Sequence, residues 1–115
     1  MIDPRGSESD QLVAIDVQRE GENAVLRIAG ELDMYSETQL QYAIAELDGD
    51  DNKIRVVVLD LSQTEFLDSS GLRAMLAAER RLQARGRAMK LRSPSPLVAR
   101  LLEVTSLADH FDIEK

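Results

Sequence analysis

The chain has 115 residues, which is the size of one domain with a single hydrophobic core. Acidic residues outnumber basic ones by 21 to 14, and the net charge of −7 argues against nucleic acid as a partner, because its phosphates would be repelled. The chain contains no cysteine, and its apolar runs are far shorter than the roughly 18 residues of a membrane span, so a cytoplasmic location without membrane contact is expected.

The first predicted elements are a tail and a hairpin. Residues 1–10 lack the apolar stretch of a secretory signal and are expected to be a disordered tail, followed by one domain over residues 11–115. Side chains alternate over residues 12–17, a polar turn containing glycine follows at 20–23, and a second apolar stretch covers 25–29. Two such stretches joined by a short turn predict a β-hairpin.

A helix and a buried strand are predicted next. Ser36 to Gln39 has the form of a capping box, in which Ser36 caps the helix and Gln39 reaches back to it. Apolar residues then recur at helical spacing, and Gly49 is expected to end the helix, within a loop at residues 48–52. Residues 54–61 are apolar without alternation, which is typical of a strand buried on both faces.

The rest of the chain predicts a helix over residues 70–85, a short strand over 88–91, and a third helix that opens at Ser95 and Pro96. Four apolar side chains of the third helix are expected to face the core: Leu97, Val98, Leu101 and Leu102. The strands at 54–61 and 88–91 are expected to be parallel neighbours. A hairpin followed by βαβα units predicts an α/β fold, with a mixed sheet and helices packed mainly on one face.

The sequence FLDSSGL at residues 66–72 lies where a strand is expected to lead into the second helix. One interpretation is that its polar residues only cap the helix, because Asp and Ser are common N-caps. The other is phosphate chemistry, because unpaired N–H groups and the helix dipole stabilise an anion at a helix start. Sites in such sheets gather at the carboxyl ends of strands, where both this motif and residues 30–33 are expected.

Three motifs in order make the sequence similar to a known family. They are GELD at residues 30–33, FLDSSGL at 66–72, and SP at 93–94 followed by the stretch 98–107. In this order and spacing, residues 12–113 resemble the STAS domain of bacterial anti-sigma factor antagonists. The resemblance implies a STAS-type fold and a partner-switching regulator that is not an enzyme.

In this family, the unmodified antagonist binds an anti-sigma factor that is also a serine kinase, which frees the sigma factor, and phosphorylation by that kinase switches binding off. The resemblance implies that Ser69 is the phosphorylation site, and we expect Ser69 also to cap the helix. The implied supporting residues are Asp68, Ser70 and Gly71. The residues implied to contact the partner are Gly30, Glu31, Leu32, Asp33, Leu72 and Arg73.

The implied partners are proteins. The kinase is expected to have the histidine-kinase-like ATPase fold and to hold ATP and its magnesium, and a phosphatase is expected to restore the hydroxyl of Ser69. The chain itself is expected to bind no cofactor. A phosphoserine brings about −1.5 to −2 charges beside Asp68, which favours release of the partner.

Two other function classes stay open. The first is a STAS scaffold that binds a transporter or a lipid-transport complex without being modified. The second is an enzyme, which the sequence argues against, because it has no Gly-rich phosphate loop with lysine and no Ser-His-Asp set. His110 has no cysteine or paired carboxylate at ligand spacing, so neither a metal site nor a catalytic role is expected there.

Overall fold

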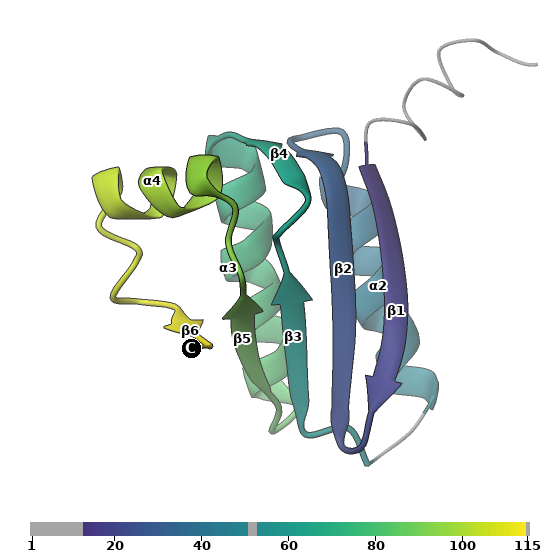
Figure 1. The fold of residues 1–115 in the computed structure, drawn as a ribbon. Helices are drawn as coiled ribbons and strands as arrows, with labels where there is room; N and C mark the ends of the chain where they lie inside the picture. The colour runs from purple at the N-terminus through teal and green to yellow at the C-terminus, as the bar shows by residue number, and fades with distance from the viewer. Residues whose placement is uncertain (1–12, 51–52, 115) are drawn as a thin grey trace, which may run out of the picture.

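The computed structural model describes residues 13–50 and 53–114, and the tail predicted over residues 1–10 lies outside the described residues. The elements follow one another as Figure 1 shows. They are β1 (Val13–Glu20), β2 (Asn23–Leu32), α2 (Glu37–Asp50), β3 (Val56–Asp60), β4 (Thr64–Leu67), α3 (Ser69–Ala84), β5 (Ala88–Arg92), α4 (Pro96–Val104) and β6 (Asp112–Ile113).

The six described strands form one mixed sheet in the order β1-β2-β3-β5-β6, with β4 also paired to β2. Strands β1 and β2 are antiparallel and form the predicted hairpin, in which Glu20 pairs with Asn23. The remaining pairs are parallel. Strands β3 and β5 are neighbours, with Val57 opposite Met89, which confirms the prediction for these two strands.

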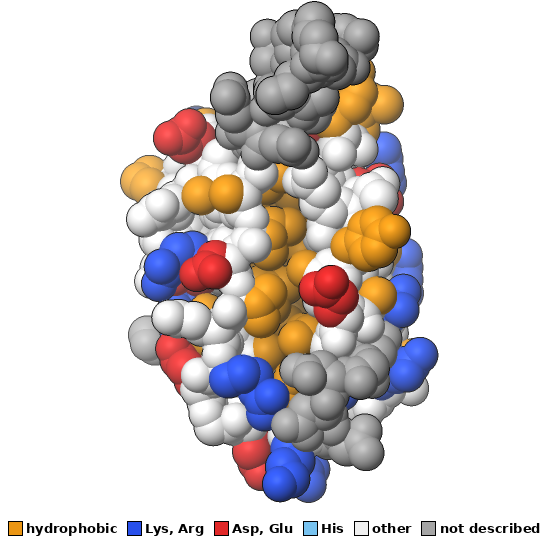
Figure 2. All heavy atoms as spheres, turned by 90° about the vertical axis from the view of Figure 1, so that its right-hand side faces the viewer, with side chains coloured by type: hydrophobic (Ala, Val, Ile, Leu, Met, Phe, Trp, Pro, Cys, Tyr) orange, Lys and Arg blue, Asp and Glu red, His pale blue; other side chains and the backbone are white. Residues whose placement is uncertain are grey.

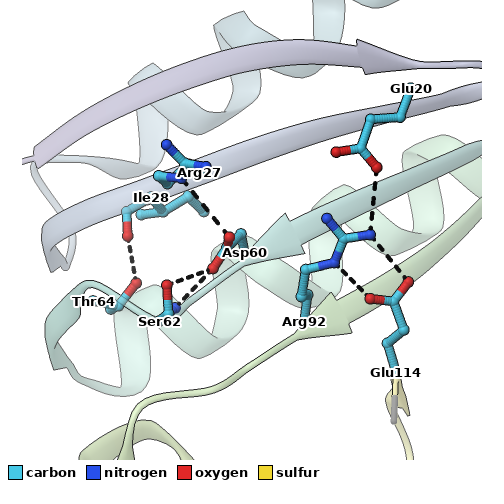
Figure 3. Close-up of polar contacts among 8 residues, drawn as sticks. All are labelled: Glu20, Arg27, Ile28, Asp60, Ser62, Thr64, Arg92 and Glu114. Carbon is cyan, nitrogen blue, oxygen red and sulfur yellow. Dashed lines mark hydrogen bonds and ion pairs between the residues drawn. The ribbon is translucent and has the colours of Figure 1, made fainter.

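Strand β4 was not predicted, and it sets the position of the second helix. Strand β2 pairs with β3 along its first half and with β4 along its end, and the register shifts between Gly30 and Glu31. Gly30 has a φ of 103°, which residues with a side chain rarely adopt. The Thr64 hydroxyl donates to the Ile28 carbonyl at 2.7 Å, as Figure 3 shows. The strand that leads into α3 is β4, and not the buried strand β3.

Helices α2 and α3 lie together behind the sheet in Figure 1, whereas α4 lies at its upper end. The side chains between the helices and the sheet are almost entirely apolar and buried. The largest of them include Leu26, Ile28, Leu40, Ile44, Leu59, Met75, Leu82 and Leu91. Full burial of one such side chain contributes about 1.5–3 kcal/mol, so this layer holds the molecule together.

Helix α2 begins directly after Ser36, as predicted, but the contacts of Ser36 and the end of the helix differ from the prediction. The Ser36 hydroxyl accepts the Asp33 N–H at 2.7 Å and donates to the Asp33 carbonyl at 3.0 Å, so it closes the turn before α2 and does not form the predicted capping box with Gln39. Helix α2 continues to Asp50, one residue past Gly49, so the predicted loop at residues 48–52 starts too early. The hydrogen bonds between Ser36 and Asp33 thus take the place of the contact predicted between Ser36 and Gln39.

Leu97 in α4 is 47% exposed, although the sequence places it in the core. Helix α4 has nine residues, and Val98 and Leu102, which are four residues apart, fill its buried face. Leu97 precedes Val98 by one residue and therefore points about 100° away around the helix. The predicted helix start at Ser95 and Pro96 is confirmed, because α4 begins at Pro96 and the Ser95 hydroxyl accepts the Val98 N–H at 3.5 Å.

The face of the sheet away from α2 and α3 carries paired charges (Figure 3). Arg27 on β2 lies 3.8 Å from Asp60 on β3. Arg92 on β5 lies 3.6 Å from Glu20 and also hydrogen-bonds Glu114, which follows β6. The hydrogen bond from Arg92 holds the pKa of the Glu114 carboxyl below its ordinary value. These pairs tie the hairpin, β5 and the C-terminal segment together.

Candidate functional site

The first turn of α3 is capped by Asp68. The backbone of Asp68 is extended, with φ −117° and ψ −171°, and its carboxylate accepts the Gly71 N–H at 3.0 Å. Its carbonyl accepts the Leu72 N–H at 3.0 Å. The prediction that Ser69 caps the helix is therefore wrong. Asp68 takes the extended position directly after β4, so Ser69 becomes the first residue of the helix.

Ser69 presents its hydroxyl at the surface where α3 begins. The residue is exposed, and its hydroxyl makes no hydrogen bond with any residue that the structure describes. The neighbouring Ser70 is half-buried, and its hydroxyl accepts a hydrogen bond from the Arg73 guanidinium at 3.2 Å. Of the two adjacent hydroxyls, that of Ser69 is the more accessible to the active site of another protein.

Gly71 allows α3 to pack closely against the end of β2. A Cβ atom at this position would lie 2.1 Å from the Leu32 carbonyl oxygen and 2.5 Å from Cδ1 of Leu67. Only glycine fits such a contact without displacing backbone. The close approach brings residues 68–71 beside residues 30–33, so the structure joins two segments that are far apart in the sequence.

The residues predicted to contact a partner divide between surface and core. Those with accessible positions are Gly30, Glu31, Asp33 and Arg73. Leu32 has no exposed surface and Leu72 is 7% exposed, so both side chains pack in the core. We assign these two leucines a supporting role, in which they hold the surrounding backbone in place.

Charged side chains lie in the turn after β2 and in the first turns of α3. The Asp33 carboxylate accepts the N–H groups of Tyr35 at 2.9 Å and Ser36 at 3.2 Å, so it is fixed in the turn after β2. The start of α3 carries the positive end of the helix dipole, and Arg73 lies one turn further on. A phosphoryl group on Ser69 would gain from the dipole and from Arg73, and would be repelled by Asp68.

His110, the one histidine of the sequence, contacts two side chains of the fold. Its ring nitrogen Nε2 lies 2.7 Å from Oε1 of Glu79, and its ring meets the Phe111 ring edge-on at a centroid distance of 5.0 Å. The contact gives a partner to the Glu79 carboxylate, which lies at the apolar side of α3. Within residues 13–50 and 53–114, no three His, Asp or Glu side chains are grouped so that they could hold a metal ion.

An apolar groove lies beside the site and was not predicted. It has a volume of about 260 Å³ and lies between β4 and α4. Its lining residues are Phe66, Leu67, Leu97, Arg100, Leu101 and Val104. In the sequence, the signal for this groove is Phe66, which directly precedes Leu67. The pattern alone could not show that Phe66 is exposed, because the exposure of Phe66 depends on β4.

No helix in the described part of the chain is long and apolar enough to cross a membrane.

Comparisons with known proteins find relatives over most of the chain. A family model described as "Mlab, STAS domain" matches residues 15–114. The anti-sigma-B factor antagonist of Bacillus subtilis (strain 168) is 29% identical over 101 residues, which are 88% of this chain and 90% of that protein.

Solved structures show the same arrangement of helices and strands. The crystal structure of an anti-sigma factor antagonist from Mycobacterium paratuberculosis has a TM-score of 0.74 at 27% identity, and the match covers 88% of this chain and 84% of that one. The Bacillus cell fate determinant SpoIIAA in its phosphorylated form has a TM-score of 0.64 at 24% identity, over 89% of this chain and 92% of that one. The second likeness supports the fold alone.

Proposed function

The chain belongs to the STAS domain family, and from this premise we propose that it is an anti-sigma factor antagonist that phosphorylation at Ser69 switches off. In its unphosphorylated form it binds an anti-sigma factor that is also a serine kinase, and the sigma factor is released. Two similar proteins named as antagonists, at 29% and 27% identity, support this function.

The observation that carries the proposal is the exposed Ser69 hydroxyl directly after the capping Asp68. Because the cap is supplied by Asp68, Ser69 can accept a phosphoryl group without losing the hydrogen bond that starts α3. The helix dipole stabilises a nearby anion by about 0.3–1 kcal/mol, so the phosphorylated chain stays folded. The modification therefore changes binding and leaves the fold intact.

The added charge of the phosphoryl group weakens binding because the contact with the partner excludes water. Phosphorylation adds about −1.5 to −2 charges next to the Asp68 carboxylate. A partner surface that fits the neutral hydroxyl must then bury a dianion beside a carboxylate, and both repulsion and desolvation oppose this. A hundredfold loss of affinity corresponds to about 2.7 kcal/mol, and a full change from 99:1 to 1:99 needs about 5.5 kcal/mol.

The chain acts as binder and substrate in this scheme, and the partner supplies the chemistry. The Ser69 Oγ forms a bond to the γ-phosphorus of ATP, the bond to ADP breaks, and the hydroxyl proton passes to a base of the kinase. ATP and magnesium are held by the kinase. A phosphatase hydrolyses the phosphoserine with water and restores the hydroxyl, which returns the antagonist to its binding form.

Two variants at Ser69 test the proposal. Ser69→Ala should bind the kinase continuously, whereas Ser69→Asp should bind at least tenfold more weakly than the parent. The measurement is the dissociation constant with each purified anti-sigma factor kinase from the source organism, in the presence of ADP. Gln83→Glu is the matched control, because it adds one negative charge at the exposed far end of α3, about 20 Å along the helix.

Equal binding by the parent, Ser69→Ala and Ser69→Asp would contradict the switch. A partner that binds all three equally would favour the unmodified scaffold, which binds a transporter or lipid-transport complex. If Gln83→Glu weakened binding as much as Ser69→Asp, the effect would follow from net charge and not from the site. Loss of phosphorylation in Ser70→Ala, with phosphorylation kept in Ser69→Ala, would move the acceptor to Ser70.

A further inference from the structure

Most of the large apolar side chains that are exposed in the described part of the chain lie on elements at one end of the sheet. Of the seven large apolar side chains that are exposed in the described part of the chain, five lie at the end of the sheet where α3 begins (Figure 1). They are Met34 and Tyr35 on the loop after β2, and Phe66, Leu97 and Val104 on β4 and α4. Such a concentration of apolar surface is typical of a contact with another protein.

Three of these side chains wall the groove between β4 and α4. Phe66 is 42% exposed, Leu97 is 47% exposed and Val104 is 65% exposed. Leu67 is buried and Leu101 is half-buried, so both form the floor. A groove of this kind accepts one or two apolar side chains from a partner and removes them from water, which is how binding hot spots are built.

One cation lies at the same groove. Arg100 is exposed, lines the groove, and forms an ion pair with no residue that the structure describes. Arg27, by comparison, pairs with Asp60, and Arg92 pairs with Glu20 and Glu114. The guanidinium of Arg100 is thus available to a carboxylate of a partner that enters the groove.

We propose that the β4–α4 groove docks an apolar segment of the kinase that phosphorylates Ser69, with an acidic side chain of that segment on Arg100. The inference rests on the proposed function. The apolar walls would anchor the kinase, and the Arg100 pair would fix the direction of the docked segment. The groove would therefore contribute to the affinity of the complex without taking part in phosphoryl transfer.

Continuity along the chain supports the kinase as the occupant. Leu67 lines the groove, and Asp68 and Ser69 follow it directly, so β4 leads from the groove into the acceptor site. A stable protein contact buries about 800 Å² on each partner, which is far more than one exposed serine and its neighbours provide. A kinase that covers Ser69 must extend over adjacent surface, and the groove is adjacent.

Substitutions at exposed groove positions test the inference. Leu97→Ser, Val104→Ser and Arg100→Glu should each raise the dissociation constant for the purified kinase with ADP by about tenfold, a loss of about 1.4 kcal/mol. They should also raise the KM for this chain in the kinase reaction, with kcat unchanged. Arg100→Lys keeps the positive charge and should lose less affinity than Arg100→Glu.

A second groove supplies the matched control. It lies between α2 and the edge strand β1, on different elements from the β4–α4 groove, and Figure 2 shows its apolar floor. Val17 lines it and is 41% exposed, so Val17→Ser removes a similar side chain from a similar setting. This variant should bind the kinase within twofold of the parent. Thermal melts of all variants exclude unfolding as the cause of weaker binding.

The outcomes separate the groove from the switch. Weaker binding by the groove variants, with Val17→Ser unaffected, supports the inference. If Leu97→Ser and Arg100→Glu bind like the parent while Ser69→Asp loses binding, the kinase does not dock in the groove. The proposed function then stays intact. A change only in self-association of the chain also overturns it, because the occupant would then be a second copy. If no kinase phosphorylates Ser69, both proposals fail.

Discussion

Substitution of Gly71 by alanine should destabilise the chain strongly, against the usual effect of this change in a helix. Replacement of glycine by alanine inside a helix normally stabilises the folded protein by about 1 kcal/mol. Here the added Cβ would lie 2.1 Å from the Leu32 carbonyl oxygen, and the atom that it meets is backbone of a paired strand. Overpacking of this kind costs about 1–3 kcal/mol, and the rigid neighbour places the cost at about 3 kcal/mol.

Thermal unfolding measures this cost. About 1 kcal/mol shifts the melting temperature of a domain of this size by about 4 °C, so Gly71→Ala should lower it by about 12 °C. Gly86→Ala is the control, because Gly86 has a φ of 75° and a Cβ atom there would have no neighbour within 4 Å among the described residues. Gly86→Ala should lower the free energy of unfolding only through the left-handed backbone, by about 1 kcal/mol, which lowers the melting temperature by about 4 °C.

A neutral or stabilising effect of Gly71→Ala would contradict the close contact between Gly71 and Leu32. It would mean that α3 does not touch the end of β2, and that residues 30–33 and 68–71 are not fixed against one another. The same variant should also slow phosphorylation of Ser69, because the start of α3 must shift to admit the methyl group. A destabilised chain with an unchanged rate would separate the packing from the acceptor geometry.

Three further predictions concern the cap, the core and pH. Asp68→Ala should cost about 1 kcal/mol by removing the cap of α3, and denaturant unfolding at pH 7 should show a loss similar to that of Ser95→Ala, which uncaps α4. Val57→Ala should cost about 2 kcal/mol through a core cavity and lower abundance without changing the affinity of the remaining folded protein for the kinase. Because the hydrogen bond from Arg92 lowers the folded-state pKa of Glu114, its stabilisation is present above the ordinary glutamate pKa and is lost as pH falls through the lowered value. The melting temperatures of the parent and Glu114→Gln should therefore differ at pH 7 and converge in acid; a constant difference would contradict the pairing.

The main elements were predictable because each has a strong sequence pattern, either a continuous apolar run or a helical spacing of apolar residues. The apolar run at residues 54–61 contains β3, and the pattern at 70–85 lies within one residue of α3 at each end. Strand β4 was not predictable, because its four residues form neither an apolar run nor an alternating pattern and are held by pairing with β2. The Thr64 hydroxyl, for example, bonds a carbonyl 36 residues away.

The site was predictable as a motif but not in its details. Asp68, Ser69 and Ser70 are all good caps, and only the end of β4 decides that Asp68 takes the position. The groove was missed because Leu97 fits an apolar helical pattern, whereas the short α4 buries Val98 and Leu102 instead. Contacts between distant residues decide these details, and the sequence pattern does not contain them.

Peptide-resolved mass spectrometry shows whether Ser69 carries a phosphoryl group in the cell. The chain is taken from its native cells, with and without stress, and is compared with the product of the purified kinase reaction. We expect one phosphoryl group on Ser69, absent from Ser69→Ala and reduced when the antagonist is active. Phosphate on Ser70 alone, or on neither serine under any condition, would contradict this expectation.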